Sequence, residues 1–582
     1  MLNEATSHRG WSCWVPLRMA WAAGVVALIA VALAGCGKKR PAQAGPALEA
    51  VREAAPLKLE GAKSIDDFVF GWLKHLQIEP AEPATDAEFF RRVHLDVTGT
   101  LPTATEAREF LSSRDANKRG ALIDRLLERD EFADYWAMKW GDVLRIKAEF
   151  PINLWPNAAQ AYHRWVRASL AENKPYDKFV REMLTSSGSN FRVGQVNFYR
   201  AMQSRTPEGI AMTAALTFMG ARADAWPDRS LSGMTACFEQ VGYKPTREWK
   251  EEIVFWDSQK LLAKPTNAVT ATNAVKVVSA SRPTNAPPQA AVFPDGTPVK
   301  LTPDRDPREV FADWLITPKN PWFARSIVNR VWSWFLGRGI IHEPDDIRDG
   351  NPPSNPDLLA YLERELVTHR YDLKHIYRLI LNSRTYQLSS RAKATGPLAE
   401  AHFASCAPRR LEAEVLLDAI NKVTGTSDLY TSPIPEPFTY IPKDTPAVAL
   451  ADGSITSPFL ALFGRSARAT GMESERINRV RPAQWLHLLN SSHIQRKIEQ
   501  GAKLRAILEA KRAESETVEE LYLAILSRFP TAEELKTVQA YGAPVADAKS
   551  GKPPGPGVGK KREDWLDIAW ALLNSEEFLY RH

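Results

Sequence analysis

Residues 89–111 read FFRRVHLDVTGTLPTATEAREFL, and this stretch predicts where one helix begins. Pro102 precedes Thr103, and Glu106 follows three residues after the threonine. In such a capping box the threonine hydroxyl and the glutamate carboxylate bond the free backbone N–H groups of the first helical turn reciprocally. The stretch therefore predicts a helix that starts after Thr103.

The same signal recurs later in the chain. Thr531 and Glu534 form a second capping box directly after a proline. Ser354 and Asp357 form a looser version, with aspartate in place of glutamate. Both pairs predict further helix starts.

Apolar residues follow helical spacing in most of the chain. Leucines recur at steps of three and four residues in 122–127 and in 359–366, whereas strict alternation is rare. The 582 residues are 44% hydrophobic, which is enough for a sizeable core. The net charge of +6 is too small and too scattered to indicate a nucleic-acid partner. We predict a mainly α, globular protein.

Three predicted helical segments end in the same short pattern, which is a leucine, four residues and an aromatic residue. The pairs are Leu127 and Phe132, Leu381 and Tyr386, and Leu573 and Phe578. We interpret them as three helical hairpins, each closed by a buried aromatic side chain. A helix-rich chain can also produce such similar segments by chance, so a true internal repeat and a chance similarity both stay open.

The first residues have the pattern of a lipoprotein signal peptide. Arg9 and Arg18 precede an uncharged run at residues 19–34, and Cys36 follows soon after it. This run of about 16 residues is shorter than the roughly 20 that a spanning helix needs. We predict that residues 1–35 are removed and that lipid on Cys36 anchors the chain in the cell envelope, in the periplasm or at the outer membrane. An uncleaved N-terminal anchor is the alternative.

Composition divides the remaining chain. Residues 264–292 contain no acidic and no aromatic residue, and residues 543–561 are rich in proline, glycine and lysine. Such segments bury too little apolar surface to offset the entropy of ordering them. The predicted parts are a signal peptide (1–35), a tether (36–63), a first helical domain (64–262), a low-complexity linker (263–292) and a second helical domain (293–582) with a mobile loop (543–561).

The cysteines and histidines lack the spacing of known metal or haem motifs. After Cys36 is lipidated, only Cys237 and Cys406 remain in the mature chain, either as a disulfide or as two buried thiols. No C-x-x-C-H segment occurs, and His369 and His375 are not part of an H-E-x-x-H motif. We therefore predict neither a metal nor a cofactor.

The segment 320–356 is dense in tryptophan, arginine and acidic residues. A functional interpretation is that five of its residues form a pocket for an anionic or sugar-like ligand. The five candidates are Arg325, Asn329, Arg330, Trp332 and Arg338. The structural alternative is a helix core face that ends at Gly337, with arginines paired to the acids at 345–349.

These segments together resemble a known pair of domains of unknown function from surface proteins of planctomycetes and their relatives. Residues 89–111, 135–145 (YWAMKWGDVLR) and 173–185 (NKPYDKFVREMLT) resemble the first, often called the cytochrome-c-like domain. Residues 320–340 (NPWFARSIVNRVWSWFLGRGI), 379–390 (LILNSRTYQLSS) and 570–580 (WALLNSEEFLY) resemble the second, the planctomycete surface domain. The resemblance implies an envelope location and no settled activity.

One departure from the family pattern bears on function. Many relatives carry a C-x-x-C-H segment where this chain, from Phe218, has none, so a c-type haem carrier is disfavoured. We expect a lipid-anchored envelope protein of unknown activity that binds a polymer, such as a polysaccharide, or an envelope protein partner. The alternative is a secreted hydrolase of polysaccharide or sulfated glycan. Two carboxylates roughly 5–10 Å apart in a cleft with a tryptophan wall would favour the hydrolase, and an exposed aromatic patch would favour binding.

Overall fold

The computed structural model describes residues 59, 61–226, 228–260, 291–542 and 560–582. The predicted signal peptide, Cys36, most of the tether and most of the linker lie outside these residues, as do positions 543–559 of the predicted mobile loop.

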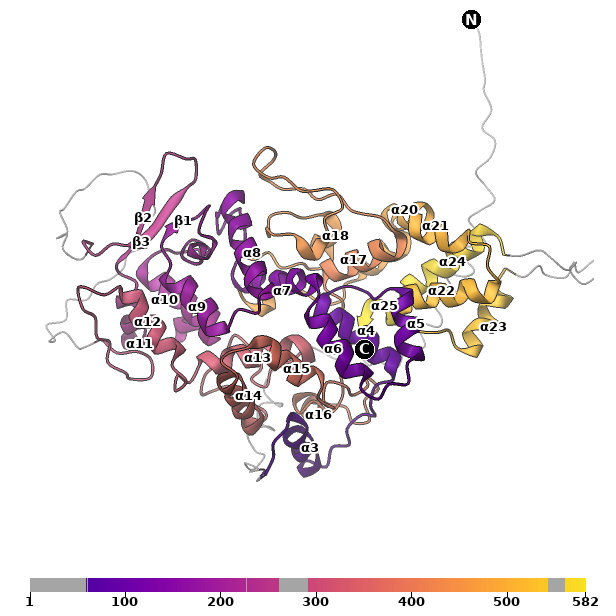
Figure 1. Cartoon of the computed structure of the whole chain (residues 1–582), viewed down its shortest axis with the longest axis horizontal. Helices are drawn as coiled ribbons and strands as arrows, with labels where there is room; N and C mark the ends of the chain where they lie inside the picture. The colour runs from indigo at the N-terminus through magenta and orange to yellow at the C-terminus, as the bar shows by residue number, and fades with distance from the viewer. Residues whose placement is uncertain (1–58, 60, 227, 261–290, 543–559) are drawn as a thin grey trace, which may run out of the picture. The chain divides into compact units, whose positions relative to one another are not determined.

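Helices dominate both described halves of the chain, so the mainly α prediction is confirmed (Figure 1). In the first half they are α3 (Ile65–His75), α4 (Asp86–Thr98), α5 (Ala104–Ser112), α6 (Lys118–Leu127), α7 (Asp130–Val143), α8 (Pro156–Ala171), α9 (Tyr176–Thr185), η1 (Gly194–Tyr199), α10 (Pro207–Ala214), η2 (Ala215–Met219), η3 (Ala223–Ala225) and α11 (Asp228–Ala236). From residue 291 onward they are α12 (Pro307–Ile316), α13 (Phe323–Leu336), α14 (Pro356–Thr368), α15 (Leu373–Leu381), α16 (Pro397–Ala401), α17 (Ala413–Thr424), η4 (Ala447–Ala449), α18 (Pro458–Leu462), η5 (Glu473–Glu475), α19 (Pro482–Asn490), α20 (Ser492–Gln500), α21 (Ala502–Leu508), α22 (Glu514–Leu526), α23 (Ala532–Ala540), α24 (Arg562–Leu573) and α25 (Glu576–Leu579).

Two small antiparallel sheets complete the described fold. One has the order β1 (Gly188–Ser189), β3 (Glu252–Trp256) and β2 (Val241–Pro245). The other pairs β4 (Arg409–Arg410) with β5 (Tyr580–Arg581). These strands have at most five residues each, which is too short for a clear alternating pattern in the sequence.

Two of the three predicted helix starts are confirmed. Thr103 and Thr531 each accept the N–H of the glutamate three residues later, and each glutamate accepts the N–H of its threonine. The Ser354 prediction is wrong, because Asn355 caps α14 and its side chain accepts the N–H of Leu358. Pro356 takes the first helical position, where its missing N–H costs nothing, so the cap must be the residue before it.

The second and third predicted hairpins end in the same local structure. After α15, Ser383 donates its hydroxyl to the Ile380 carbonyl and accepts the N–H of buried Tyr386. After α24, Ser575 donates to the Leu572 carbonyl and accepts the N–H of buried Phe578 in the same way. This shared geometry supports a true repeat of these two segments.

The first hairpin ends differently. It lacks the serine and keeps only a backbone contact, in which the N–H of Phe132 donates to the Arg129 carbonyl at 3.1 Å; the N–H of Phe578 donates to the Ser575 carbonyl in the same way.

The segments before and after the predicted linker pack into one compact unit with one hydrophobic core. Trp136 of α7 stacks on Tyr377 of α15 at 4.4 Å between ring centroids, and it contacts Trp334 and Phe335 of α13, each at 5.4 Å. The boundary at 263–292 stays a prediction, but the described residues on its two sides share their interior.

Two adjacent arginines of α4 tie the two segments together. Buried Arg91 donates to the carbonyls of Ile525 and Phe578 at 2.8 and 3.0 Å. Buried Arg92 donates to the carbonyls of Tyr386 and Leu388 at 2.6 and 2.9 Å. Helix α4 therefore binds the ends of both repeated hairpins through backbone contacts.

Candidate functional site

The five residues proposed from sequence lie on α13 and on the turn after it, but they contact different neighbours. Asn329 is fully buried and bonds both backbone groups of Ile341. Arg330 is buried and pairs with Asp345 at 2.7 Å. Both contacts fix the turn that follows the helix.

The other three candidates do not complete a shared pocket. Arg325 pairs with Glu363 of α14 at 2.7 Å, Trp332 is fully buried, and Arg338 is half-buried. Neighbouring positions on a helix point in different directions, and both flanks of α13 are covered by protein. The arrangement favours the structural interpretation, and Gly337 ends the helix in the left-handed conformation as expected.

A buried ionic network lies between α7 and the second segment. Glu412 pairs with Arg581 and with Lys139 of α7, both at 2.5 Å. Asp142 of α7 pairs with Arg468 at 3.0 Å and with Arg476 at 2.7 Å. Each of these side chains is mostly or fully buried.

The network holds Glu412 in the ionised form. Burial alone would raise the pKa of Glu412, but Arg581 and Lys139 outweigh it and hold that pKa well below the usual range. The general acid of a glycoside hydrolase needs the opposite shift. Glu412 is therefore not a candidate for this general acid.

A small hollow of about 10 Å³, room for about one water molecule, opens beside this network. Its lining residues are Lys139, Asp142, Val143, Met472, Glu473 and Arg476. Glu473 accepts the indole N–H of Trp334 at 3.0 Å, and Asp142 is already bound by two arginines. The hollow is therefore far smaller than the roughly 300–1,000 Å³ of typical ligand pockets.

An aromatic surface is the stronger candidate for binding. We define it as Trp155, Trp249, Lys250 and Phe438, which come from three separate loops. The rings of Trp155 and Phe438 lie 5.3 Å apart, and the Lys250 ammonium lies 5.8 Å from the Trp155 ring and 5.3 Å from the Trp249 ring. Trp249 is 69% exposed and Phe438 is 50% exposed. Solvent-exposed aromatic clusters of this kind mark interaction sites.

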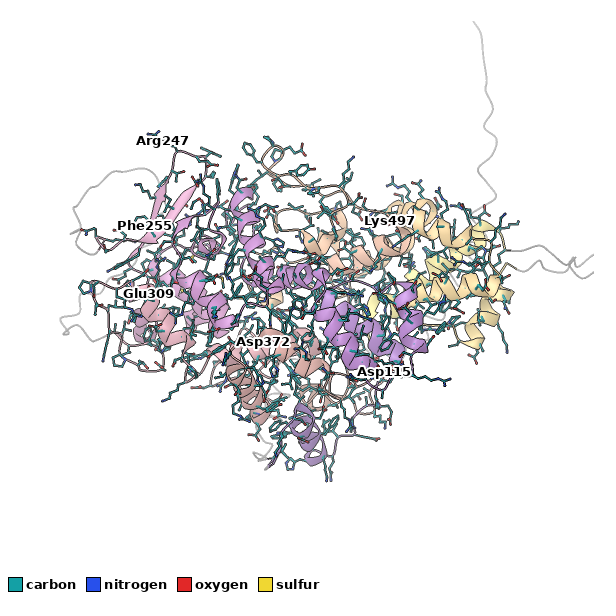
Figure 2. The ribbon with its side chains drawn as sticks, viewed as in Figure 1. Asp115, Arg247, Phe255, Glu309, Asp372 and Lys497 are labelled. Carbon is teal, nitrogen blue, oxygen red and sulfur yellow. The ribbon has the colours of Figure 1, made fainter. Side chains whose placement is uncertain are left out.

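The three loops meet on one side of the fold. Trp155 directly precedes α8, Trp249 lies in the turn between β2 and β3, and Phe438 lies in the long loop after α17 (Figure 1). Figure 2 places Arg247 at the tip of the same β2–β3 turn. Phe150 and Tyr440, which are 75% and 70% exposed, lie in two of these loops.

The backbone under this surface is strained. Trp155 has φ 71° and ψ 148°, a region that is almost restricted to glycine. Asn153 and Lys250 also have positive φ, at 60° and 64°. Such conformations cost about 1–3 kcal/mol each and persist where the surrounding structure enforces them, often at binding sites.

Contacts to the second segment hold the residues that lead into this turn. Asp452 accepts the N–H of Ala148 at 2.8 Å, and Ser454 accepts the N–H of Glu149 at 3.0 Å. The sequence analysis missed this surface. A signal was present, because the segments PTREWKEE (245–252) and PEPFTY (435–440) place aromatic residues in predicted turns, with no apolar residues at helical spacing beside them.

Cys237 and Cys406 are both buried and free, so the thiol interpretation holds and the disulfide does not. Burial raises the pKa of the Cys237 thiol to about 12, which keeps it unreactive. Within the described part of the chain, no helix is both long and apolar enough to cross a bilayer.

Comparison with known proteins gives two family matches. Residues 64–235 match the model PSCyt2, described as a protein of unknown function (DUF1549), and residues 307–542 match PSD1, described as a protein of unknown function (DUF1553). No curated protein and no solved structure matches the chain. The chain therefore belongs to the proteins that join a PSCyt2 domain to a following PSD1 domain, the paired cytochrome-c-like and surface domains of planctomycetes.

Proposed function

We propose that this protein is a lipid-anchored component of the cell envelope that binds a polysaccharide through the aromatic surface. The observation that carries the proposal is the strained Trp155, which sits in contact with Phe438 and Lys250 at the surface. Trp155 is half-buried, and the neighbouring Trp249 and Phe438 are at least half exposed. Exposed aromatic residues beside a strained backbone support a ligand-binding role.

The chemistry of the surface suits an acidic polysaccharide. Indole and phenyl rings offer flat apolar faces against which the C–H faces of sugar rings pack, and aromatic packing contributes about 0.5–1.5 kcal/mol beyond the area buried. The Lys250 ammonium, which lies over the Trp155 and Trp249 rings, offers positive charge to acidic groups of the polymer. The lipobox before Cys36 would hold this surface at the envelope, where such polymers are found.

Affinity electrophoresis through gels that contain dextran sulfate or unmodified dextran tests the polymer binding. We expect dextran sulfate to retard the wild type more than dextran does. Trp249→Ala should weaken binding about two- to tenfold, the equivalent of the aromatic contribution. Leu429→Ala is the matched control, because Leu429 is 86% exposed and is not part of the aromatic surface.

Equal retardation of Trp249→Ala and wild type would contradict the role of this surface. Failure of both gels to retard the wild type would contradict polysaccharide binding itself, and capture of an envelope protein instead would favour a protein partner.

Membrane fractionation tests the anchor separately. We expect Cys36→Ala to accumulate as an unprocessed precursor or to appear in the soluble fraction. Mature size together with full membrane retention of this variant would contradict lipidation at Cys36.

A further inference from the structure

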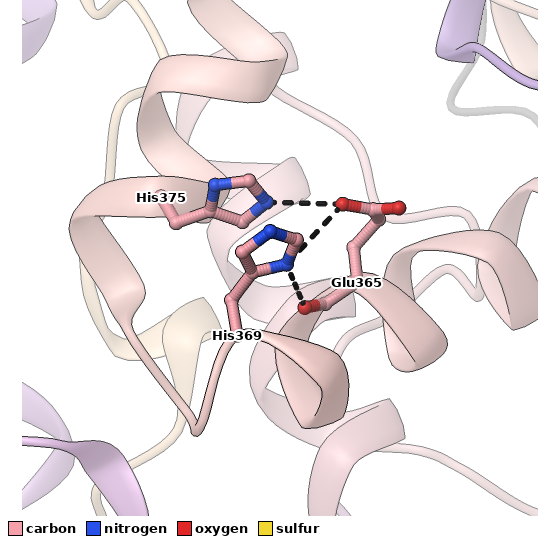
Figure 3. A group of neighbouring side chains, drawn as sticks. All are labelled: Glu365, His369 and His375. Carbon is pink, nitrogen blue, oxygen red and sulfur yellow. Dashed lines mark hydrogen bonds and ion pairs between the residues drawn. The ribbon is translucent and has the colours of Figure 1, made fainter.

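Two histidines and a glutamate meet at the hairpin between α14 and α15 (Figure 3). The Nε2 atom of His375 lies 3.0 Å from a carboxylate oxygen of Glu365. The rings of His369 and His375 stack with their centroids 3.6 Å apart and their planes at 17°, so one ring must turn out of the stack for both to face the same ion. One ligand atom from each of the three residues lies within 4.8 Å of the others.

The hairpin backbone brings these residues together. Glu365 lies in the last turn of α14, and His369 follows it at i+4 on the same helical face. Arg370 and Tyr371 both have positive φ, at 55° and 61°, and this tight turn reverses the chain so that His375 returns over His369.

Contacts around the hairpin hold the turn in place. Asp372 caps α15 by accepting the N–H of His375, and Asn173 donates its amide to the same aspartate at 2.9 Å. The carbonyl of Tyr371 accepts the N–H of Tyr176 at 3.0 Å. The three candidate ligands are therefore positioned by helix ends rather than by a loose loop.

The ligand set matches that of a divalent transition-metal site. Two imidazoles and one carboxylate, with a fourth position open to solvent, form the usual set of a three-ligand zinc site. Bonds of about 2.0–2.1 Å in tetrahedral geometry place neighbouring ligand atoms about 3.3 Å apart. The observed 3.0 Å between His375 Nε2 and the Glu365 carboxylate is close to this spacing.

A second contact has the form expected of a metal-binding histidine. His369 Nδ1 lies 2.9 Å from the Glu365 backbone carbonyl. In the tautomer that carries the proton on Nδ1, this nitrogen donates to the carbonyl and leaves the lone pair of Nε2 free. Histidines that bind metals usually donate their other ring N–H to a carbonyl or a carboxylate in this way.

The geometry points to a binding site for a divalent transition-metal ion, with zinc as the best fit, formed by Glu365, His369 and His375. The His369 side chain is 44% exposed, and the other two side chains are about one-quarter exposed, so an ion can reach the site and keep a water ligand. The sequence motif H-E-x-x-H does not describe this site, because the ligands follow the spacing E-x3-H-x5-H.

Calorimetric titration with Zn²⁺ tests the site on purified protein that carries no polyhistidine tag and has been treated with a chelator. We expect one high-affinity ion per chain. The variants His369→Gln and His375→Gln should each weaken Zn²⁺ binding at least about tenfold, since even outer-shell changes cost about 10–100-fold. The absorption spectrum of bound Co²⁺ should show tetrahedral coordination in the wild type and lose it in both variants.

The double variant His487→Gln/His493→Gln is the matched control. It removes the other neighbouring histidine pair, whose nitrogens lie 3.3 Å apart, and should leave Zn²⁺ affinity unchanged. Circular dichroism verifies that each variant is folded. Absence of stoichiometric binding by the wild type, or loss of binding in the control with retention in His369→Gln and His375→Gln, would overturn the assignment.

Discussion

Replacement of Arg581 by alanine should strongly destabilise the fold, because this guanidinium joins the two segments of the chain. Arg581 is 2% exposed and pairs with Glu412 at 2.5 Å and with Asp96 of α4 at 3.3 Å. It also donates to the hydroxyl of Tyr135 at 3.1 Å. Its removal leaves two buried carboxylates with fewer partners.

The remaining contacts limit the damage but do not remove it. Glu412 keeps Lys139 at 2.5 Å, and Asp96 keeps the hydroxyl of Tyr386 at 2.9 Å and Arg409 at 3.4 Å. Removal of one partner from a buried ion pair costs about 3–5 kcal/mol. With this partial compensation we expect a loss near the lower limit, about 3 kcal/mol, which is a large part of a typical stability of about 5–15 kcal/mol.

Urea unfolding, monitored by tryptophan fluorescence, measures this loss as a lower urea concentration at the midpoint of unfolding. The matched control is Arg108→Ala, which removes a guanidinium from an exposed pair with Glu519 at 2.8 Å. An exposed pair contributes less than about 1 kcal/mol, so this control should change the midpoint little. Equal midpoints for the two variants would refute the role of Arg581 as a buried link between the segments.

Two further predictions concern pH and proteolysis. Burial alone would raise the pKa of Glu414, but Arg476 and Arg465 outweigh burial and lower that pKa from 4.5 to about 2. The ionised Glu414 side chain therefore stabilises the fold above pH 4.5. This contribution is lost as the pH falls towards 2. The stability difference between wild type and Glu414→Gln, measured by urea unfolding at several pH values, should therefore shrink by about 3 kcal/mol over this range, and a difference independent of pH would contradict the shift. Limited proteolysis should cut first within 263–292, and the two fragments should still elute together from a native sizing column because they share one core. Separate elution, or a first cut within 100–250, would count against this arrangement.

The sequence alone was sufficient to predict local features such as helix starts. It was not sufficient to predict the aromatic surface or the histidine cluster. Capping boxes such as Thr103 and Glu106 depend on contacts three residues apart, so the pattern alone predicts them. The aromatic surface depends on three loops that meet only in the folded chain. The cluster around His375 depends on two residues with positive φ, which nothing in their side chains requires.

The contacts of Arg91 and Arg92 also bear on how the protein is made. Their carbonyl partners in the repeated hairpins follow α4 by 294 to 487 residues. A ribosome adds about 5–20 residues per second, so α4 waits on the order of half a minute to two minutes for its last partner. During that interval the two arginines and the other residues of α4 that are buried in the finished protein lack the groups that cover them. A chain with this order of assembly gains from delaying the folding of α4 until its synthesis is nearly complete.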